Sequence, residues 1–259
     1  MALKSQSLIV YGLQVTILNQ NLDFVSSSGS HTAVIPLGFY SVTSIADIIA
    51  TQMGSTDTSN TYTVTVDRTI LGGTQNRVTI SSNGTLLTLK FATGPNAATT
   101  IAGLIGFNAT DYTGSTSYSG SQSCGTALIP DYIGYSYCDD FNTAKLFGAV
   151  NVAASGLKES VTFNIQYFLE IIFQFEAKAR LTLWKSFFLW AIQQRPFDFT
   201  PEISDPNTFY QVTLESTSYD AKGLGYQMKE MLPNFPNYYS TDKLKFRILE
   251  QQSEFISVG

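Results

Sequence analysis

The chain has 259 residues, of which 44% are hydrophobic and only 14% are charged, and its formal net charge is −5. This length can bury one large core or two medium ones, while the charged fraction is well below the roughly 25% of an average soluble protein. The acidic balance lacks the basic footprint of a nucleic-acid-binding protein, and the scarcity of charge suggests an uncharged polar surface or one covered by other chains.

The N-terminal segment MALKSQSLIVYGLQV lacks the basic region, apolar core and cleavage site of a secretory signal. The most apolar window, 165–175, is about half the length of a membrane span. We therefore expect neither secretory export nor a transmembrane helix. The cysteines, Cys124 and Cys138, are too few for a disulfide scaffold, and they either pair with each other or stay free.

Residues 1–125 predict a small β-rich domain with two short helices. Alternating apolar residues predict strands near 62–66, 78–80 and 87–91, and the Asn83-Gly84 dipeptide predicts a hairpin between the last two. Helical spacing of isoleucines predicts a helix within 40–53, with Ser44 and Asp47 in a capping arrangement. A second short helix is expected at 97–105.

A Gly- and Ser-rich stretch, 111–126, is typical of an exposed linker or long loop, and it separates a first half with few charges from a more charged second half. We therefore expect two domains, 1–125 and 126–259. Together they predict an α+β, mostly β chain.

One very long strand dominates the second half. From Val161 to Phe175 every odd residue is apolar and the even ones are mostly polar, which places the apolar residues on one face of a strand. Fifteen residues span about 50 Å at roughly 3.3 Å each, about three times a usual strand. Such a strand indicates a sheet that curves, closes or extends beyond its own domain, and so it points to assembly.

A helix is expected at about 177–194, ending before Arg195-Pro196 because a residue preceding proline disfavours helical geometry. Its apolar residues cover an arc of about 200°, roughly double what docking on one core requires. A second layer or a neighbouring subunit must cover the surplus. Further strands are expected near 209–215, 226–231 and 243–249. Aromatic residues are enriched where subunits meet, and the candidates for a subunit interface are Phe173, Phe175, Trp190, Phe197 and Phe199.

The sequence offers little for catalysis. The single histidine, His31, excludes zinc sites that need several histidines, and no nucleotide-binding or nucleophile-elbow motif occurs. Glu170 and Glu176 share a strand face and form the one carboxylate pair worth considering for sugar hydrolysis. The adjacent Asp139-Asp140 pair lacks the spacing of a calcium loop. We expect no catalytic, cofactor-binding or metal-binding residue, and no enzyme.

Several segments match a known pattern. IPLGFYSVTSIADIIATQMG at 35–54, TYTVTVDRT at 61–69, NRVTIS at 76–81 and IAGLIGFNATDYTG at 101–114 together resemble a domain common in structural proteins of tailed bacteriophages. The second half, from the aromatic stretch at 184–217 through GLGYQMKEMLP and KLKFRILE, looks like the accompanying tail-tip module.

This resemblance implies a virion protein of the distal-tail or baseplate kind, without a cofactor, that forms a ring around the tail axis. The ring is expected to be a hexamer of a tail-tube-like β-sandwich with one flanking helix, in contact with other tail and baseplate proteins and with no membrane. DNA would pass an acidic inner surface without specific binding. The candidates for facing that lumen are Gln166, Glu170, Gln174 and Glu176.

Two other functions share this composition. The first half would serve as a host-surface glycan-binding module if Tyr112 and Tyr118 stack on sugars. Alternatively, the chain would be a capsid decoration or head-fibre protein.

Overall fold

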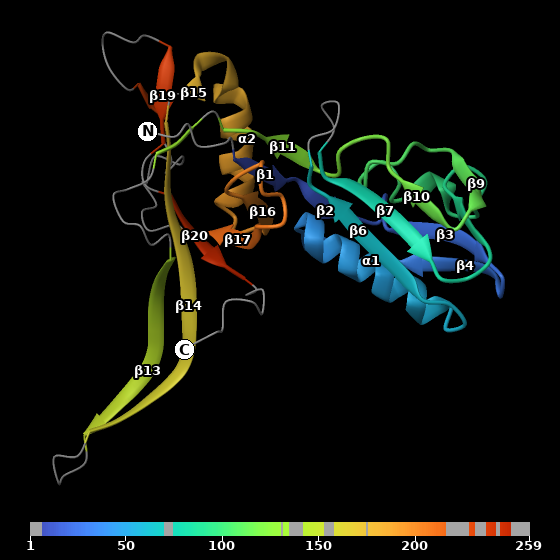
Figure 1. The fold of residues 1–259 in the computed structure, drawn as a ribbon, viewed down its shortest axis with the longest axis horizontal. Helices are drawn as coiled ribbons and strands as arrows, with labels where there is room; N and C mark the ends of the chain where they lie inside the picture. Colours follow the sequence, from blue (N-terminus) through green and yellow to red (C-terminus); the bar gives the residue numbers. More distant parts are fainter. Residues whose placement is uncertain are drawn as a thin grey trace. The chain divides into compact units, whose positions relative to one another are not determined.

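The computed structural model describes residues 7–69, 75–130, 132–134, 142–152, 158–174, 176–215, 228–230, 237–241 and 244–249. Across these residues the chain is mostly β, with several sheets and two α-helices, which confirms the α+β, mostly β class (Figure 1). The chain divides into two compact units. The first is Met1–Ile129 with Arg195–Phe209, and the second is Pro130–Gln194 with Tyr210–Gly259. The first boundary, after Ile129, therefore lies four residues beyond the predicted boundary after residue 125. In addition, the later segment Arg195–Phe209 belongs to the first unit.

The first unit is built from antiparallel pairs. One sheet has the order β4-β3-β8-β9, a second β10-β7-β6, a third pairs β2 with β5, and β1 lies between β11 and β16. Their bounds are β1 Leu8–Tyr11, β2 Leu13–Val15, β3 Asn21–Ser26, β4 Gly29–Val34, β5 Gly38–Tyr40, β6 Tyr62–Asp67, β7 Arg77–Ser82, β8 Leu87–Lys90, β9 Asp111–Ser115, β10 Ser117–Ser119, β11 Thr126–Leu128 and β16 Phe197–Thr200.

The predicted hairpin at Asn83-Gly84 is wrong, although the strands on both sides exist. β7 pairs with β6 and β10, whereas β8 pairs with β3 and β9, so the chain changes sheets between them. The Asn83 side chain accepts a hydrogen bond from Thr61 N (2.7 Å), and Asn83 N donates to Thr61 O (3.1 Å). The dipeptide thus fixes the chain against the start of β6 rather than closing a two-residue turn.

Helix α1 (Val42–Thr56) confirms the first predicted helix, but its cap differs. Ser41 and Ser44 form a reciprocal capping box, so the helix starts before the predicted cap at Ser44 and Asp47. Its buried face consists of Val42, Ile45, Ala46, Ile49 and Met53. The second predicted helix is reduced to the 3-10 turn η1 (Ala97–Thr99), and Gly106 shortly after it has a φ of +79°.

The second unit is organised around β14 (Lys158–Gln174), which confirms a very long strand where the alternation predicted one. Leu169, Ile171 and Phe173 are buried, and Glu170, Ile172 and Gln174 are half-buried, so the alternation holds over 169–174. It fails just before this stretch, where Phe168 is buried and Tyr167 is half-buried. In its sheet β14 lies between β20 (Leu244–Ile248) and β12 (Tyr132–Gly134), with β17 (Tyr210–Leu214) beyond β20. β13 (Asn142–Val152) pairs with β14 as well.

After β14 come β15 (Glu176–Ala177), the 3-10 turn η2 (Lys178–Arg180) and α2 (Leu181–Ala191). β15 pairs with β19 (Tyr238–Ser240), which also pairs with β18 (Lys229–Glu230). α2 is shorter than the predicted helix at 177–194. Its buried residues are Trp184, Phe187, Phe188, Trp190 and Ala191, whereas Leu183 and Leu189 are exposed. The wide apolar arc is therefore mostly covered within the chain.

Candidate assembly surfaces

The β13–β14 ribbon is the most unusual feature of the second unit. β13 pairs with β14 from Asn142 opposite Leu169 to Val152 opposite Lys158, with one irregularity between Phe147 and Gly148. β20 and β12 pair only with 168–174 of β14. Among the described residues, 158–167 therefore pair with β13 alone, and Figure 1 shows the two strands continuing together past the rest of their sheet. We call β13 with 158–167 the β-arm.

The β-arm has two open edges within the described part of the chain: the outer edge of β13 and the outer edge of 158–167. The latter spans about 33 Å at roughly 3.3 Å per residue. A two-stranded ribbon is marginally stable in water, and a long open edge exposes a row of N–H and C=O groups that another strand can pair with. Among the described residues, the β-arm is thus a two-stranded ribbon with an unpaired edge on each side.

The predicted interface residues lie elsewhere. Phe173, Phe197 and Phe199 are fully buried and Trp190 is nearly so, all within a single chain. Phe173 packs on Trp184 with ring centroids 5.0 Å apart. Within one chain these residues are therefore part of its core. Their contact with another subunit stays a prediction, and Phe175 lies outside the described residues.

The lumen candidates fall into different environments. Glu170 and Gln174 are half-buried on β14, and the backbone register places Glu170 opposite Lys245 of β20. The side chain of Gln166 lies outside the described residues. Glu176 is fully buried, accepts a hydrogen bond from Trp184 Nε1 (3.0 Å) and lies 3.8 Å from Arg180 Nη1. Glu176 therefore orients α2 against β15 and presents no carboxylate to a lumen.

A buried charge pair joins β16 to α1 inside the first unit. Asp198 Oδ2 accepts hydrogen bonds from Thr43 N (3.2 Å), Thr43 Oγ1 (2.9 Å) and Arg68 Nη2 (3.1 Å). The Arg68 guanidinium also lies 3.5 Å above the Phe209 ring. Burial raises the pKa of Asp198, and Arg68 opposes that rise. A carboxylate at the N-terminus of α1 is favoured by the helix dipole. The Asp198–Arg68 pair therefore fixes Arg195–Phe209 to the rest of the first unit.

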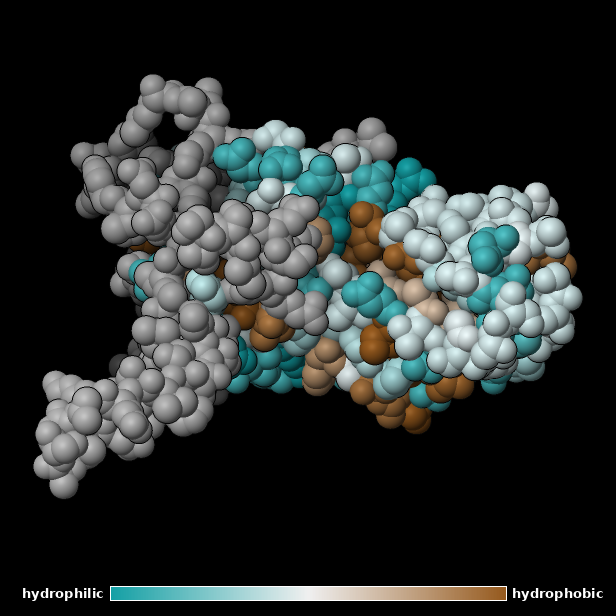
Figure 2. All heavy atoms as spheres, turned by 60° about the horizontal axis from the view of Figure 1, so that its bottom comes forward, coloured by the Kyte–Doolittle hydropathy of each residue, from teal (hydrophilic) through white to brown (hydrophobic). Residues whose placement is uncertain are grey.

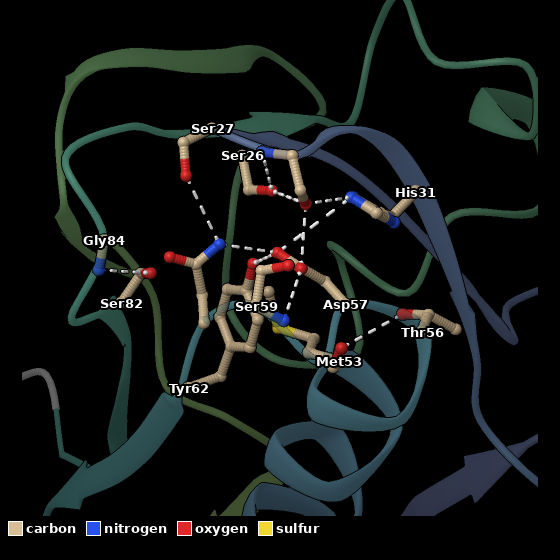
Figure 3. A network of polar contacts seen from close by, with 12 residues as sticks. Ser26, Ser27, His31, Met53, Thr56, Asp57, Ser59, Tyr62, Ser82 and Gly84 are labelled. Carbon is tan, nitrogen blue, oxygen red and sulfur yellow. Dashed lines mark hydrogen bonds and ion pairs between the residues drawn. The ribbon is translucent and has the colours of Figure 1, made fainter.

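His31 is part of a polar network between the β3–β4 turn and the end of α1 (Figure 3). Ser28 Oγ donates to Asp57 Oδ1 (2.8 Å), and His31 Nε2 lies 2.9 Å from the same hydroxyl. The His31 ring stacks on Phe24 at 5.2 Å. In a catalytic triad the carboxylate orients the imidazole through its other nitrogen, whereas Asp57 here bonds to the serine. The arrangement fixes the β3–β4 turn against the end of α1.

Asp57 is the centre of that network. It caps the C-terminal end of α1 and also accepts from Tyr62 Oη (2.6 Å) and Asn60 Nδ2 (2.8 Å). Burial alone would raise the pKa of Asp57, but hydrogen bonds from Tyr62, Asn60 and the neighbouring serines hold it well below its usual range. Burial and the Asp57 hydrogen bond together raise the pKa of Tyr62 to about 12. Asp57 thus stays ionised at neutral pH.

The two tyrosines suggested for sugar stacking are not open platforms. Tyr118 is buried and donates to Leu87 O (2.9 Å), while the half-buried Tyr112 packs edge-on against Phe91, Phe107 and Tyr118. They join the core of the first unit. A shallow cavity of about 300 Å³ lies nearby, lined by Asp23, Phe24, Val25, Ser30, His31, Thr32, Lys90, Thr93, Gly94 and Pro95. Asp23 at this cavity already accepts hydrogen bonds from Thr32 and Asn96.

Cys124 is a buried free thiol whose pKa is raised to about 12, first by burial and then by the negative charge of Asp198. Its predicted alternative partner, Cys138, lies outside the described residues, as do Asp139 and Asp140. Within the described ranges no cluster of three or more His, Cys, Asp or Glu residues could hold a metal ion. None of the described helices is long and apolar enough to cross a membrane.

Comparison with known proteins gives no family. No protein-family model matches the chain, and no curated protein matches its sequence. Function therefore has to be argued from the surfaces described above.

Proposed function

We propose that this chain is a structural protein of a bacteriophage tail, located at the tail tip or baseplate, and that its second unit assembles into a ring around the tail axis. The β-arm is the observation that carries the proposal. Its two open backbone edges belong to one ribbon, so a copy on each side can use them in the same way. A head-to-tail contact of this kind forms a closed ring when the rotation from one copy to the next brings the last copy back to the first.

Composition supports the same conclusion. The chain has 15 basic and 20 acidic residues among 259, and Figure 2 shows broad pale areas beside separate hydrophilic and hydrophobic patches. An uncharged polar surface suits permanent packing among many protein neighbours. A net negative charge of −5 lets a nucleic acid pass without adhering.

Shortening the β-arm tests the proposal. Lys145 lies opposite Gln166 in the register, so removing 146–165 and joining these two residues through Asn-Gly leaves a short hairpin. Light scattering after size-exclusion chromatography should give the intact chain a mass that is a whole multiple, expected to be six, of 28.4 kDa. The shortened chain should remain folded by circular dichroism and elute as a monomer.

Two results would contradict the proposal. An intact chain that stays monomeric at high concentration, and that cannot be located in the tail of a particle by electron microscopy, has no ring-forming role. A shortened chain that still forms the same ring removes the β-arm from the argument.

A further inference from the structure

The cavity of about 300 Å³ in the first unit lies between the β3–β4 hairpin and the segment that follows β8. Asp23 pairs with Thr32 and Val25 pairs with Ser30, so these four side chains lie on one face of the hairpin, opposite the face that packs in the core. His31 borders the cavity as well, but its ring stacks on a core phenylalanine on the opposite face. The volume is at the lower end of the range for small-ligand sites.

Two carboxylates fix the segment that forms one wall of this cavity. Asp23 accepts hydrogen bonds from Asn96 N (2.7 Å) and Asn96 Nδ2 (2.9 Å). Asp111 accepts hydrogen bonds from Ala92 N (2.8 Å) and Thr93 N (3.1 Å). The wall is therefore held at both ends before any ligand arrives, and a site fixed in this way loses little conformational entropy on binding.

The lining has hydrogen-bonding capacity that the described part of the chain does not use. A carboxylate offers about four acceptor positions, and Asp23 uses three, the third for Thr32 Oγ1 (2.6 Å). Lys90 Nζ has three N–H groups, of which two donate, to Thr93 Oγ1 (3.3 Å) and Asp111 Oδ2 (3.2 Å). The exposed Ser30 hydroxyl has no partner among the described residues. One acceptor, one donor and one hydroxyl thus remain for a ligand.

The charges around the cavity favour an uncharged ligand. Asp111 already matches the Lys90 ammonium, whereas Asp23, only 4% exposed, has no cationic partner among the described residues. An anion in the cavity would be repelled by Asp23, and a cation would lie beside the Lys90 ammonium. Val25 and Pro95 add apolar groups to the lining. A fitting ligand therefore combines uncharged donors and acceptors with some C–H surface.

We propose that this cavity binds one uncharged sugar unit of a polysaccharide. A sugar ring carries neighbouring hydroxyl groups, so one can donate to Asp23 Oδ2 while the next accepts from Lys90 Nζ. A third can bond to Ser30 Oγ, which both donates and accepts, and the C–H groups of the ring can lie on Val25. This role belongs to the first unit and does not depend on a ring built by the second.

Saturation-transfer NMR on the full chain tests the proposal with the methyl glycosides of glucose, galactose, mannose and N-acetylglucosamine. The methyl group takes the place of the next unit in a polysaccharide. At least one glycoside should bind, with a dissociation constant of about 1 mM, as expected for a ligand of this size. Its uronic acid counterpart, which carries a carboxylate at C6, should bind at least tenfold more weakly. Binding of none of the four, or equal binding of the uronic acid, would overturn the proposal.

Two substitutions assign the binding to the cavity. Ser30→Phe fills the cavity from an exposed position on β4 and should abolish binding. Lys90→Met removes the donor, leaves the backbone hydrogen bonds to Asp111 in place, and should weaken binding at least tenfold. Thr63→Phe is the matched control, because Thr63 is exposed on β6 outside the cavity, and it should bind the sugar as the unmodified chain does.

Circular dichroism and thermal unfolding check that the three variants fold. Binding that survives in both Ser30→Phe and Lys90→Met, or that is lost equally in Thr63→Phe, would place the sugar elsewhere and overturn the proposal. The NMR experiment detects binding to a single chain and to a ring alike. Failure to bind a sugar would therefore leave the proposed ring intact, and failure to assemble would leave the sugar site intact.

Discussion

Removing the Asp198 carboxylate should destabilise the first unit strongly. In the structure it accepts three hydrogen bonds, two from Thr43 and one from Arg68, and both charged side chains are almost fully buried. Asp198→Ala leaves the guanidinium without its counter-charge in a site with little water. Breaking a buried ion pair in this way costs about 3–5 kcal/mol. The exposed Asp205, which accepts a hydrogen bond from Thr208, provides a control whose replacement should cost less than about 0.5 kcal/mol.

The assay can separate the two units because both tryptophans, Trp184 and Trp190, belong to the second. Tryptophan fluorescence during urea denaturation follows the second unit, while far-ultraviolet circular dichroism follows both. Asp198→Ala should move the circular dichroism transition to lower urea and leave the fluorescence transition in place.

A second background tests the cause. In an Arg68→Met chain no buried cation remains, so adding Asp198→Ala should cost much less than it does in the unmodified chain. Equal costs in both backgrounds, or a cost below about 1 kcal/mol in the unmodified chain, would refute the argument that the buried charge pair fixes β16.

Three further outcomes follow from the buried polar groups. Because hydrogen bonds hold the pKa of Asp57 below its usual value of 3.8, its contribution to stability is present above that value and is lost as pH falls. Tyr62→Phe removes one donor, so it should cost about 1–2 kcal/mol at neutral pH and move the midpoint of acid unfolding upward. Burial would raise the pKa of Asp111, but hydrogen bonds, chiefly from Thr93, lower it to about 2. Asp111→Asn should therefore reduce the loss in free energy of unfolding between about pH 4 and 2. Trp184→Phe leaves the buried Glu176 without its indole donor and should cost about 1.5–3 kcal/mol by urea denaturation, and adding Glu176→Gln should recover part of that cost.

Local periodicity was enough to predict the elements whose burial follows a regular pattern. The isoleucine spacing predicted α1, and the strict alternation predicted β14, because each pattern matches the geometry of one element packed on one face. The Asn83-Gly84 hairpin failed for a reason outside its own sequence. A hairpin requires its two strands to pair, and β7 pairs with β10 instead.

The buried charges were beyond sequence reasoning. Asp198 and Arg68 are 130 residues apart in the chain, and Thr43 is 155 residues from Asp198. Nothing in the Phe197-Asp198-Phe199 tripeptide distinguishes a buried carboxylate from one that faces solvent on an alternating strand. The burial of Asp198 follows from the pairing of β16 with β1, which the sequence does not indicate.

The surface available for assembly differs from the predicted one. The sequence placed the surplus apolar surface on aromatic residues, but Phe173, Phe197 and Phe199 are used inside the chain. What remains available among the described residues is of two kinds: backbone edges on the β-arm, and exposed aliphatic side chains such as Ile17, Leu18 and Leu37. Strand edges supply direction and register, because their hydrogen bonds form only in alignment, whereas aliphatic patches supply free energy without fixing register. A ring of identical copies needs both, since register sets the rotation between neighbours and apolar burial keeps them together.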